Sequence, residues 1–112
     1  MSLSKESAME LLKVVLLSSD NKTEPNAPYE VGKKYLIRTV TMTQTGRLTA
    51  VYNNELVLED AAWIADTGRF NECFKDPSVL KEVEPVSGKV IVGRNAIIDV
   101  FEWNHDLPRE VK

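Results

Sequence analysis

The chain has 112 residues, of which 43% are hydrophobic and 28% charged, as in an ordinary single globular domain. Its formal net charge of −3 disfavours binding of nucleic acid by the surface as a whole, because such binding depends on an excess of basic side chains. The single cysteine, Cys73, excludes an internal disulfide and a cysteine-rich metal site, and it favours a cytoplasmic setting.

Residues 1–28 are expected to form an N-terminal helix and a polar linker. Ser7 and Glu10 have the spacing of a capping box, and a mostly apolar run follows as far as Leu17. This pattern predicts a helix over residues 5–17, although the β-branched residues within it leave a strand as the alternative. The run is too short to cross a bilayer, so no membrane association is expected.

The apolar surface of this helix needs a partner, because nearly every residue outside Glu10 and Lys13 is apolar. Leu12 and Leu16 are therefore expected to pack on the barrel of the same chain or on a neighbouring subunit. The linker of residues 18–28 contains two prolines and spans about 36 Å when fully extended, which allows either arrangement.

Residues 29–112 read as one β domain. The segment 34–43 predicts a strand with Tyr35 and Ile37 on one face and Leu36 on the other. A break is expected at Thr45-Gly46, followed by a strand over residues 47–52. Asn53-Asn54 predicts a type I′ hairpin turn, and the next strand, 55–64, is expected to bend at residues 60–62.

A short helical insert is predicted around residues 69–82, anchored by Phe70, Phe74, Val79 and Leu80. Asp76-Pro77 has the pattern of an N-cap followed by a proline at the first helical position. Strands are then expected over residues 89–92 and 96–103. The polar tail, 104–112, is expected to be frayed, with His105 solvated.

Five short strands joined by tight turns predict a mainly β protein, a small bent barrel with an N-terminal helix and a helical insert. An incompletely closed barrel leaves strand edges with unpaired backbone groups. A homo-oligomer formed by pairing of these edge strands is therefore expected.

The sequence resembles the Sm-like (LSm) superfamily over about 45 positions. Gly46-Arg47-Leu48 followed by Leu56-Val57-Leu58-Glu59-Asp60 is similar to the first motif of that family. The segment from Val90 to Ile98, with Gly93-Arg94-Asn95 at its centre, is similar to the second. The resemblance implies a five-stranded Sm-like or SH3-like barrel that assembles into a ring through its edge strands. Many members of the family bind single-stranded RNA near the pore.

Several positions depart from the family pattern. Glu55 stands where the family has an RNA-contacting asparagine, and its carboxylate repels phosphate. The arginine follows Gly93 instead of preceding it, and an extra segment, 67–88, separates the two motifs. RNA is thus disfavoured as a partner by Glu55 and by the acidic charge. The chain also looks similar to small proteins of phages and their hosts.

The residues suggest binding and assembly and offer no catalytic apparatus. Glu59 and Asp60 are neighbours on a strand and are expected to point to opposite faces. Cys73 is expected to pack with phenylalanines, although the nearby Lys75 would lower the pKa of its thiol if the two approached. No cofactor and no metal site is expected. The candidate ligand-binding residues are Asn53, Asn54, Glu55, Arg94 and Asn95. The candidate interface residues are Trp63, Phe70, Phe74, Leu12 and Leu16.

The favoured interpretation is a non-enzymatic, self-assembling small barrel that acts as a binding or scaffolding protein. Two alternatives remain at this point. One is RNA binding in the Sm manner, and the other is an accessory or virion component of a phage.

Overall fold

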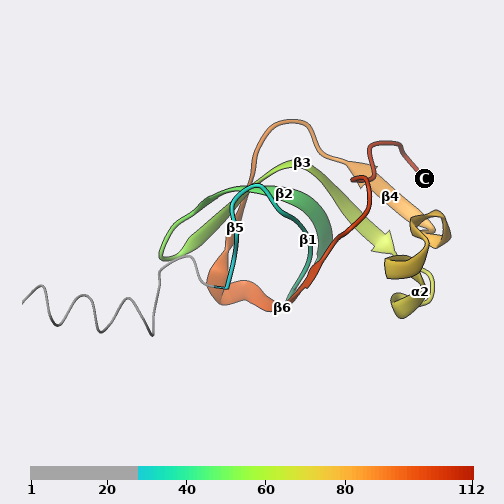
Figure 1. Ribbon diagram of the computed structural model, residues 1–112, viewed down its shortest axis with the longest axis horizontal. Helices are drawn as coiled ribbons and strands as arrows, with labels where there is room; N and C mark the ends of the chain where they lie inside the picture. Colours follow the sequence, from blue (N-terminus) through green and yellow to red (C-terminus); the bar gives the residue numbers. More distant parts are fainter. Residues whose placement is uncertain (1–27) are drawn as a thin grey trace, which may run out of the picture.

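The computed structural model describes residues 28–112, which form a mainly β, antiparallel structure with one short α-helix (Figure 1). The expected N-terminal helix, most of the linker and the interface residues Leu12 and Leu16 lie outside the described residues. Within residues 28–112, no helix is long and apolar enough to cross a membrane.

Six strands make up the sheet, one more than the sequence predicted. They are β1 (Lys34–Thr39), β2 (Thr43–Val51), β3 (Glu55–Asp66), β4 (Glu82–Pro85), β5 (Val90–Gly93) and β6 (Ile97–Glu102). Their order is β4-β3-β2-β1-β6, and β5 also pairs with β3. The long strand β3 therefore serves two partners along one edge, β5 beside its first residues and β4 beside its last ones. The sheet curls but does not close, because the described strands β5 and β6 are not paired with each other.

The break predicted at Thr45-Gly46 is wrong. The chain turns earlier, where the backbone N–H of Thr39 donates to the carbonyl of Met42 at 2.7 Å, and Gly46 lies inside β2. A Cβ atom on Gly46 would come within 3.0 Å of the Cβ of Leu58, so the glycine allows β2 and β3 to approach closely.

The bend expected in β3 is confirmed. Asp60 is the one non-glycine residue among those described that has a positive φ, +51°, and the β2–β3 register shifts opposite it. The hairpin at Asn53-Asn54 is also confirmed, with the N–H of Tyr52 donating to the carbonyl of Glu55 at 2.8 Å. The type I′ assignment is wrong, because neither asparagine has a positive φ.

The helical insert is confirmed as two pieces, α2 (Phe70–Lys75) and the 3₁₀ helix η1 (Pro77–Val79). The carboxylate of Asp76 caps η1 by accepting a hydrogen bond from the backbone N–H of Ser78 at 3.0 Å. Strand β4 follows directly and had not been predicted. Its four residues are too few to show a clear alternation, and only pairing with β3 makes them a strand.

Two hydrophobic clusters hold the sheet, one on each face. The concave face buries Tyr35 and Ile37 together with Leu48, Leu56, Leu58, Ala61 and Val92. The other face buries a cluster that includes Cys73 of α2. Its members are Leu36, Ala62, Ile64, Cys73, Leu80, Val83 and Trp103. The predicted alternation of Tyr35 and Ile37 against Leu36 is thus confirmed, and β1 is buried on both sides.

The C-terminal tail is ordered against the domain, so the prediction of a frayed tail is wrong. Lys112 and Val83 exchange two backbone hydrogen bonds, of 2.9 and 3.0 Å, which adds the end of the chain to β4. Arg109 donates to the carbonyl of Ala61 at 2.7 Å. His105 is half-buried with its Nε2 2.6 Å from the carbonyl oxygen of Phe74, which corrects the expectation of a solvated ring.

Candidate functional site

An open groove of about 780 Å³ runs along β6. Its walls come from the segment before β1, from the β2–β3 hairpin and from the 3₁₀ turn η2 (Arg94–Ala96), which joins β5 to β6. The lining residues on β6 are Ile97, Ile98, Asp99, Val100 and Glu102. The groove therefore gives access to the edge of β6 that faces away from β1.

Arg94 connects the walls of this groove. Its Nη1 donates to the carbonyl of Tyr52 at 2.9 Å, and its backbone N–H donates to the carbonyl of Asn54 at 2.9 Å. Its guanidinium carbon lies 5.3 Å from the centre of the Tyr29 ring, within the range of a cation–π contact. Arg94 therefore fixes the β2–β3 hairpin against the turn between β5 and β6.

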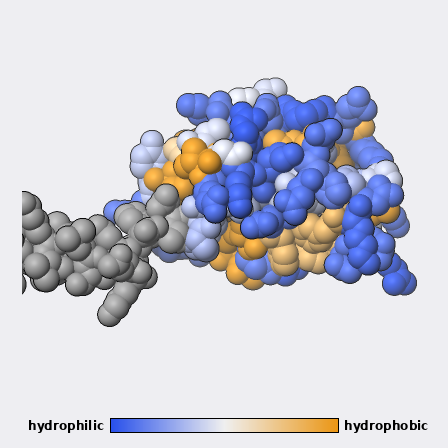
Figure 2. Space-filling model, viewed as in Figure 1, coloured by the Kyte–Doolittle hydropathy of each residue, from blue (hydrophilic) through white to orange (hydrophobic). Residues whose placement is uncertain are grey.

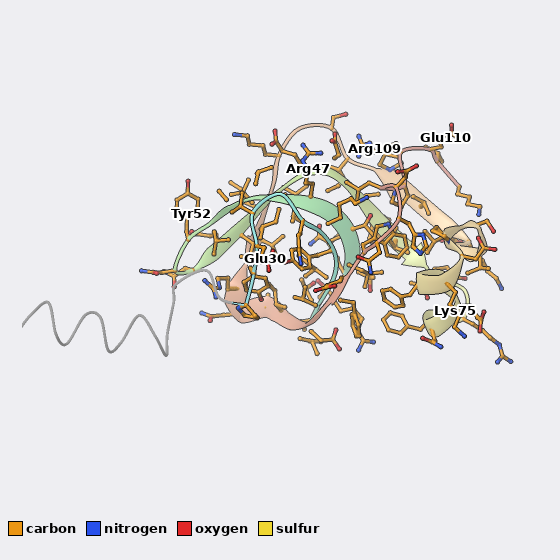
Figure 3. All side chains as sticks on the ribbon, in the orientation of Figure 1. Glu30, Arg47, Tyr52, Lys75, Arg109 and Glu110 are labelled. Carbon is orange, nitrogen blue, oxygen red and sulfur yellow. The ribbon has the colours of Figure 1, made fainter. Side chains whose placement is uncertain are left out.

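The structure brings the five predicted ligand-binding residues into one region. Asn53, Arg94 and Asn95 line the groove, whereas Asn54 and Glu55 do not. Glu55 lies opposite Gly93 in the β3–β5 pairing, so its backbone adjoins η2 while its side chain is exposed. The side chain of Tyr52 projects from the same hairpin, at the end of the molecule away from Lys75 (Figure 3).

Charges of both signs line the groove. Lys33 lies 3.4 Å from Glu30 and 3.8 Å from Glu102, and its hydrogen bond with Glu30 raises the pKa of its ammonium group. Asp99 accepts hydrogen bonds from the guanidinium of Arg38, which lower the pKa of the Asp99 carboxyl. Three carboxylates, of Glu30, Asp99 and Glu102, and two cations, Lys33 and Arg94, line the groove, so its lining has no basic excess.

The pairing register shows which backbone groups of β6 face the groove. The N–H of Trp103 donates to the carbonyl of Lys34 at 2.9 Å, and the antiparallel register continues from this pair through Tyr35 and Glu102. Hydrogen-bonded and non-hydrogen-bonded pairs alternate along such a ladder, so the N–H groups of Val100 and Glu102 point away from β1. These groups form an edge on which another strand can add.

The predicted interface residues separate into two groups. Trp63 is exposed over 38% of its surface, on the outer side of β3. Phe70 and Phe74 are half-buried and pack with their rings 5.1 Å apart, at the margin of the second hydrophobic cluster. The guanidinium carbon of Arg38 lies 4.8 Å from the centre of the Phe70 ring. The two phenylalanines thus attach α2 to its own sheet.

Cys73 is the buried residue of α2 and packs in the second hydrophobic cluster beside these phenylalanines, as expected. Its thiol is fully buried and donates to the carbonyl of Phe70 at 2.9 Å. Burial raises the pKa of this thiol, so the expectation that Lys75 would lower it is wrong. A protonated, buried thiol is a poor nucleophile, and its role here is packing.

Glu59 and Asp60 both reach the same partner, contrary to the expectation that they would diverge. The Nη1 of Arg47 lies 2.6 Å from Asp60, and its Nη2 lies 3.9 Å from Glu59. The positive φ of Asp60 redirects its side chain and allows this convergence. Arg47 and Arg109 lie on the same side of the sheet (Figure 3), and the hydrogen bond from Arg47, more than the charge of Arg109, lowers the pKa of Asp60.

Sequence reasoning identified three of the residues that line the groove, and the residues that it missed include Tyr29, Lys33 and Asp99. None of them stands in a motif, and only the curvature of the sheet brings them beside Arg94.

Within the described part of the chain, no group of three or more His, Cys, Asp or Glu side chains is placed to hold a metal ion. Comparison of the chain with protein-family models, with curated proteins and with solved structures finds no match.

Proposed function

We propose that this chain is a non-enzymatic, self-assembling protein that acts by binding or scaffolding, and that its sheet is an Sm-like or SH3-like barrel. Three features support the barrel. The strands follow the order β5-β3-β2-β1-β6, the long strand β3 bends at Asp60, and the 3₁₀ turn η2 connects the two outer strands.

The observation that carries the assembly proposal is the pair of open edges. Strand β5 pairs on one side with β3, and β6 pairs on one side with β1, so each has a second edge without a strand partner among the described residues. Each also exposes an isoleucine, Ile91 at 70% on β5 and Ile98 at 65% on β6. Open edges with exposed apolar side chains are templates for strand addition.

Because the two edges differ, β5 of one copy is expected to pair with β6 of the next. Such a head-to-tail contact produces a ring when the rotation closes and a filament when it does not. The N–H groups of Val100 and Glu102 would donate to the incoming strand.

Native mass spectrometry and analytical ultracentrifugation at micromolar concentration test this proposal. Ile91→Lys adds a charge to the edge of β5, and Glu102→Pro removes a donor from the edge of β6 without removing a hydrogen bond to β1. Both variants are expected to dissociate the oligomer. Val31→Lys is the control, because Val31 is 58% exposed and lies outside the strands. A wild-type protein that is monomeric under these conditions would contradict the proposal.

RNA binding in the Sm manner is the second candidate, favoured by one observation. The side chains of Asn53, Arg94 and Asn95 line one groove with Tyr29, and amides, a guanidinium and an aromatic ring are groups that bind bases and phosphates. If this function holds, Glu55→Asn strengthens binding of oligo-U in fluorescence anisotropy, and Asn95→Ala weakens it while the Arg94 contacts persist. Binding that does not change with salt or with either variant would refute it.

A further inference from the structure

The outer surface beside the β1–β2 turn is apolar. Val40, Met42, Trp63 and Ile98 surround a groove of about 430 Å³, and their exposed fractions are 73%, 43%, 38% and 65%. These four residues, here called the outer apolar face, are half of the eight large hydrophobic residues that the described chain exposes. Figure 2 shows hydrophobic side chains gathered on the lower side of the molecule, over β6 and toward α2. A concentration of this kind marks a docking surface.

The outer apolar face also carries little charge. The remaining residues of its groove are Thr39, Thr41, Thr43, Ile64, Ala65 and Arg38. Arg38 is the one charged residue in this groove, and Asp99 already neutralises it through a two-point hydrogen bond. An apolar partner can therefore cover the groove without desolvating an unpaired charge.

We propose that residues 8–17 of the same chain cover the outer apolar face. This segment contains Leu11, Leu12, Val14, Val15, Leu16 and Leu17, and its only charged residues are Glu10 and Lys13. It matches the chemistry of the face and has the same need to be removed from water.

The start of the described chain lies on a path to this face. Pro28 lines the groove along β6, and Ile98 lines both that groove and the groove of the outer apolar face. The two grooves thus share Ile98 as a lining residue. Residues 18–27 span up to about 33 Å when extended, so the linker allows residues 8–17 to lie over a face that borders the start of the described chain.

A segment of the same chain is favoured over a second copy as the group that covers the face, because its effective concentration at the face is higher. A short flexible linker holds a tethered segment at an effective concentration in the millimolar range, roughly a thousandfold above that of a second chain at micromolar concentration. The proposal therefore does not depend on the assembly through β5 and β6, and it is expected to hold in the monomer.

Quenching of tryptophan fluorescence by acrylamide tests whether the face is covered. Trp103 is 1% exposed, so the quenching reports Trp63, and Trp63→Phe identifies that contribution. The double variant Leu12→Asp, Leu16→Asp is expected to raise the quenching constant about twofold, because the segment leaves the ring. Lys13→Asp is the matched control, since it changes a residue that is already charged and leaves the leucines in place. An unchanged quenching constant in the leucine variant overturns the proposal.

A disulfide test decides which chain supplies the segment. Leu12→Cys is combined with Val40→Cys on the face, or with Ile91→Cys, a residue equally exposed but on β5. Cys73 is buried and does not compete in the folded protein. The proposal expects a disulfide within one chain for the Val40 pair and none for the Ile91 pair. Disulfides between chains would assign the face to a second copy and overturn the proposal. An equal yield of disulfide in the two pairs, or no disulfide in either, would also overturn it.

Discussion

Gly46 of β2 lies directly against Leu58 of β3, since a Cβ atom on Gly46 would lie 3.0 Å from the Cβ of Leu58. Directly beside this contact, Arg47 binds the carboxylate of Asp60, the residue at which β3 bends. Gly46 therefore gives room for the bend in β3, and the ion pair between Arg47 and Asp60 holds it. The curvature of the sheet, and with it the groove along β6, depends on this arrangement.

Gly46→Ala is expected to destabilise the domain by about 1–3 kcal/mol, because the added methyl group overpacks the contact with Leu58. Urea denaturation followed by circular dichroism measures the change. Gly93→Ala is the matched control, since Gly93 has an extended backbone and no atom lies within 4 Å of the position of its Cβ. An effect of equal size in both variants would show that the close approach is not the cause.

The free energy of unfolding is expected to fall in acid, because Asp60 and Asp99 become protonated and lose their ion pairs with arginine. Hydrogen bonds from Arg47 and Arg38 lower the pKa of these two carboxyls below 3.8 in the folded protein. Their contribution is therefore complete above the pKa of the unfolded chain and is lost as the pH falls through the lower folded value, from about pH 5 toward pH 2.

The double variant Asp60→Asn, Asp99→Asn is expected to show a weaker dependence of stability on pH than the wild type. Its melting temperature should be lower than that of the wild type at neutral pH and should approach the wild-type value in acid. Glu110→Gln, which removes a carboxylate from the exposed tail, provides the comparison. Parallel melting curves for the wild type and the double variant across the pH range would exclude these ion pairs as the source.

Removal of residues 110–112 is expected to open the edge of β4. The backbone N–H of Val83 donates to the carbonyl of Lys112, so its amide hydrogen should exchange faster in the truncated protein. The amide of Leu48, which donates to the carbonyl of Lys33 on the other side of the sheet, should exchange at an unchanged rate. Hydrogen exchange followed by NMR gives both rates in one experiment. Unaltered exchange at Val83 would mean that the tail does not protect β4.

The thiol of Cys73 is expected to resist modification in the folded protein. Burial raises its pKa and excludes reagents, so reaction with Ellman's reagent at pH 8 should be slow until the chain unfolds. Phe74→Ala removes a ring that packs beside Cys73 and should accelerate the reaction by loosening α2. Rapid labelling of the wild-type protein would contradict the position of Cys73 in the second hydrophobic cluster.

Features that depend on neighbouring residues were predicted well from the sequence. The alternation of Tyr35 and Leu36, the hairpin at Asn53-Asn54 and the cap at Asp76 all follow from side-chain period or from local backbone preference, and all are confirmed. The β2–β3 hairpin and the turn η2 lie next to each other because β5 pairs with the first residues of β3, and this pairing brings Asn53, Arg94 and Asn95 to one groove.

Features that depend on distant contacts were predicted wrongly or missed. A glycine after a threonine is typical of a turn, and only the approach of Leu58 shows why Gly46 belongs inside a strand. The tail looks frayed in sequence because it is polar, yet its backbone bonds to Val83 and its Arg109 bonds to Ala61. The contacts of Arg94 were also missed, because the sequence of a loop does not show that its arginine will bind the carbonyl groups of Tyr52 and Asn54 in another turn.

The sequence by itself determined which residues of β1 face the core, where β3, β5 and β6 lie to within two residues, and that the chain would form a mainly β structure. These properties follow from hydrophobic period and from backbone preferences that act over a few residues. Only the tertiary structure decided which edges stay open, which charges meet in the groove and where the outer apolar face lies. Those outcomes depend on the bend of β3, through which residues far apart in the chain come within bonding distance.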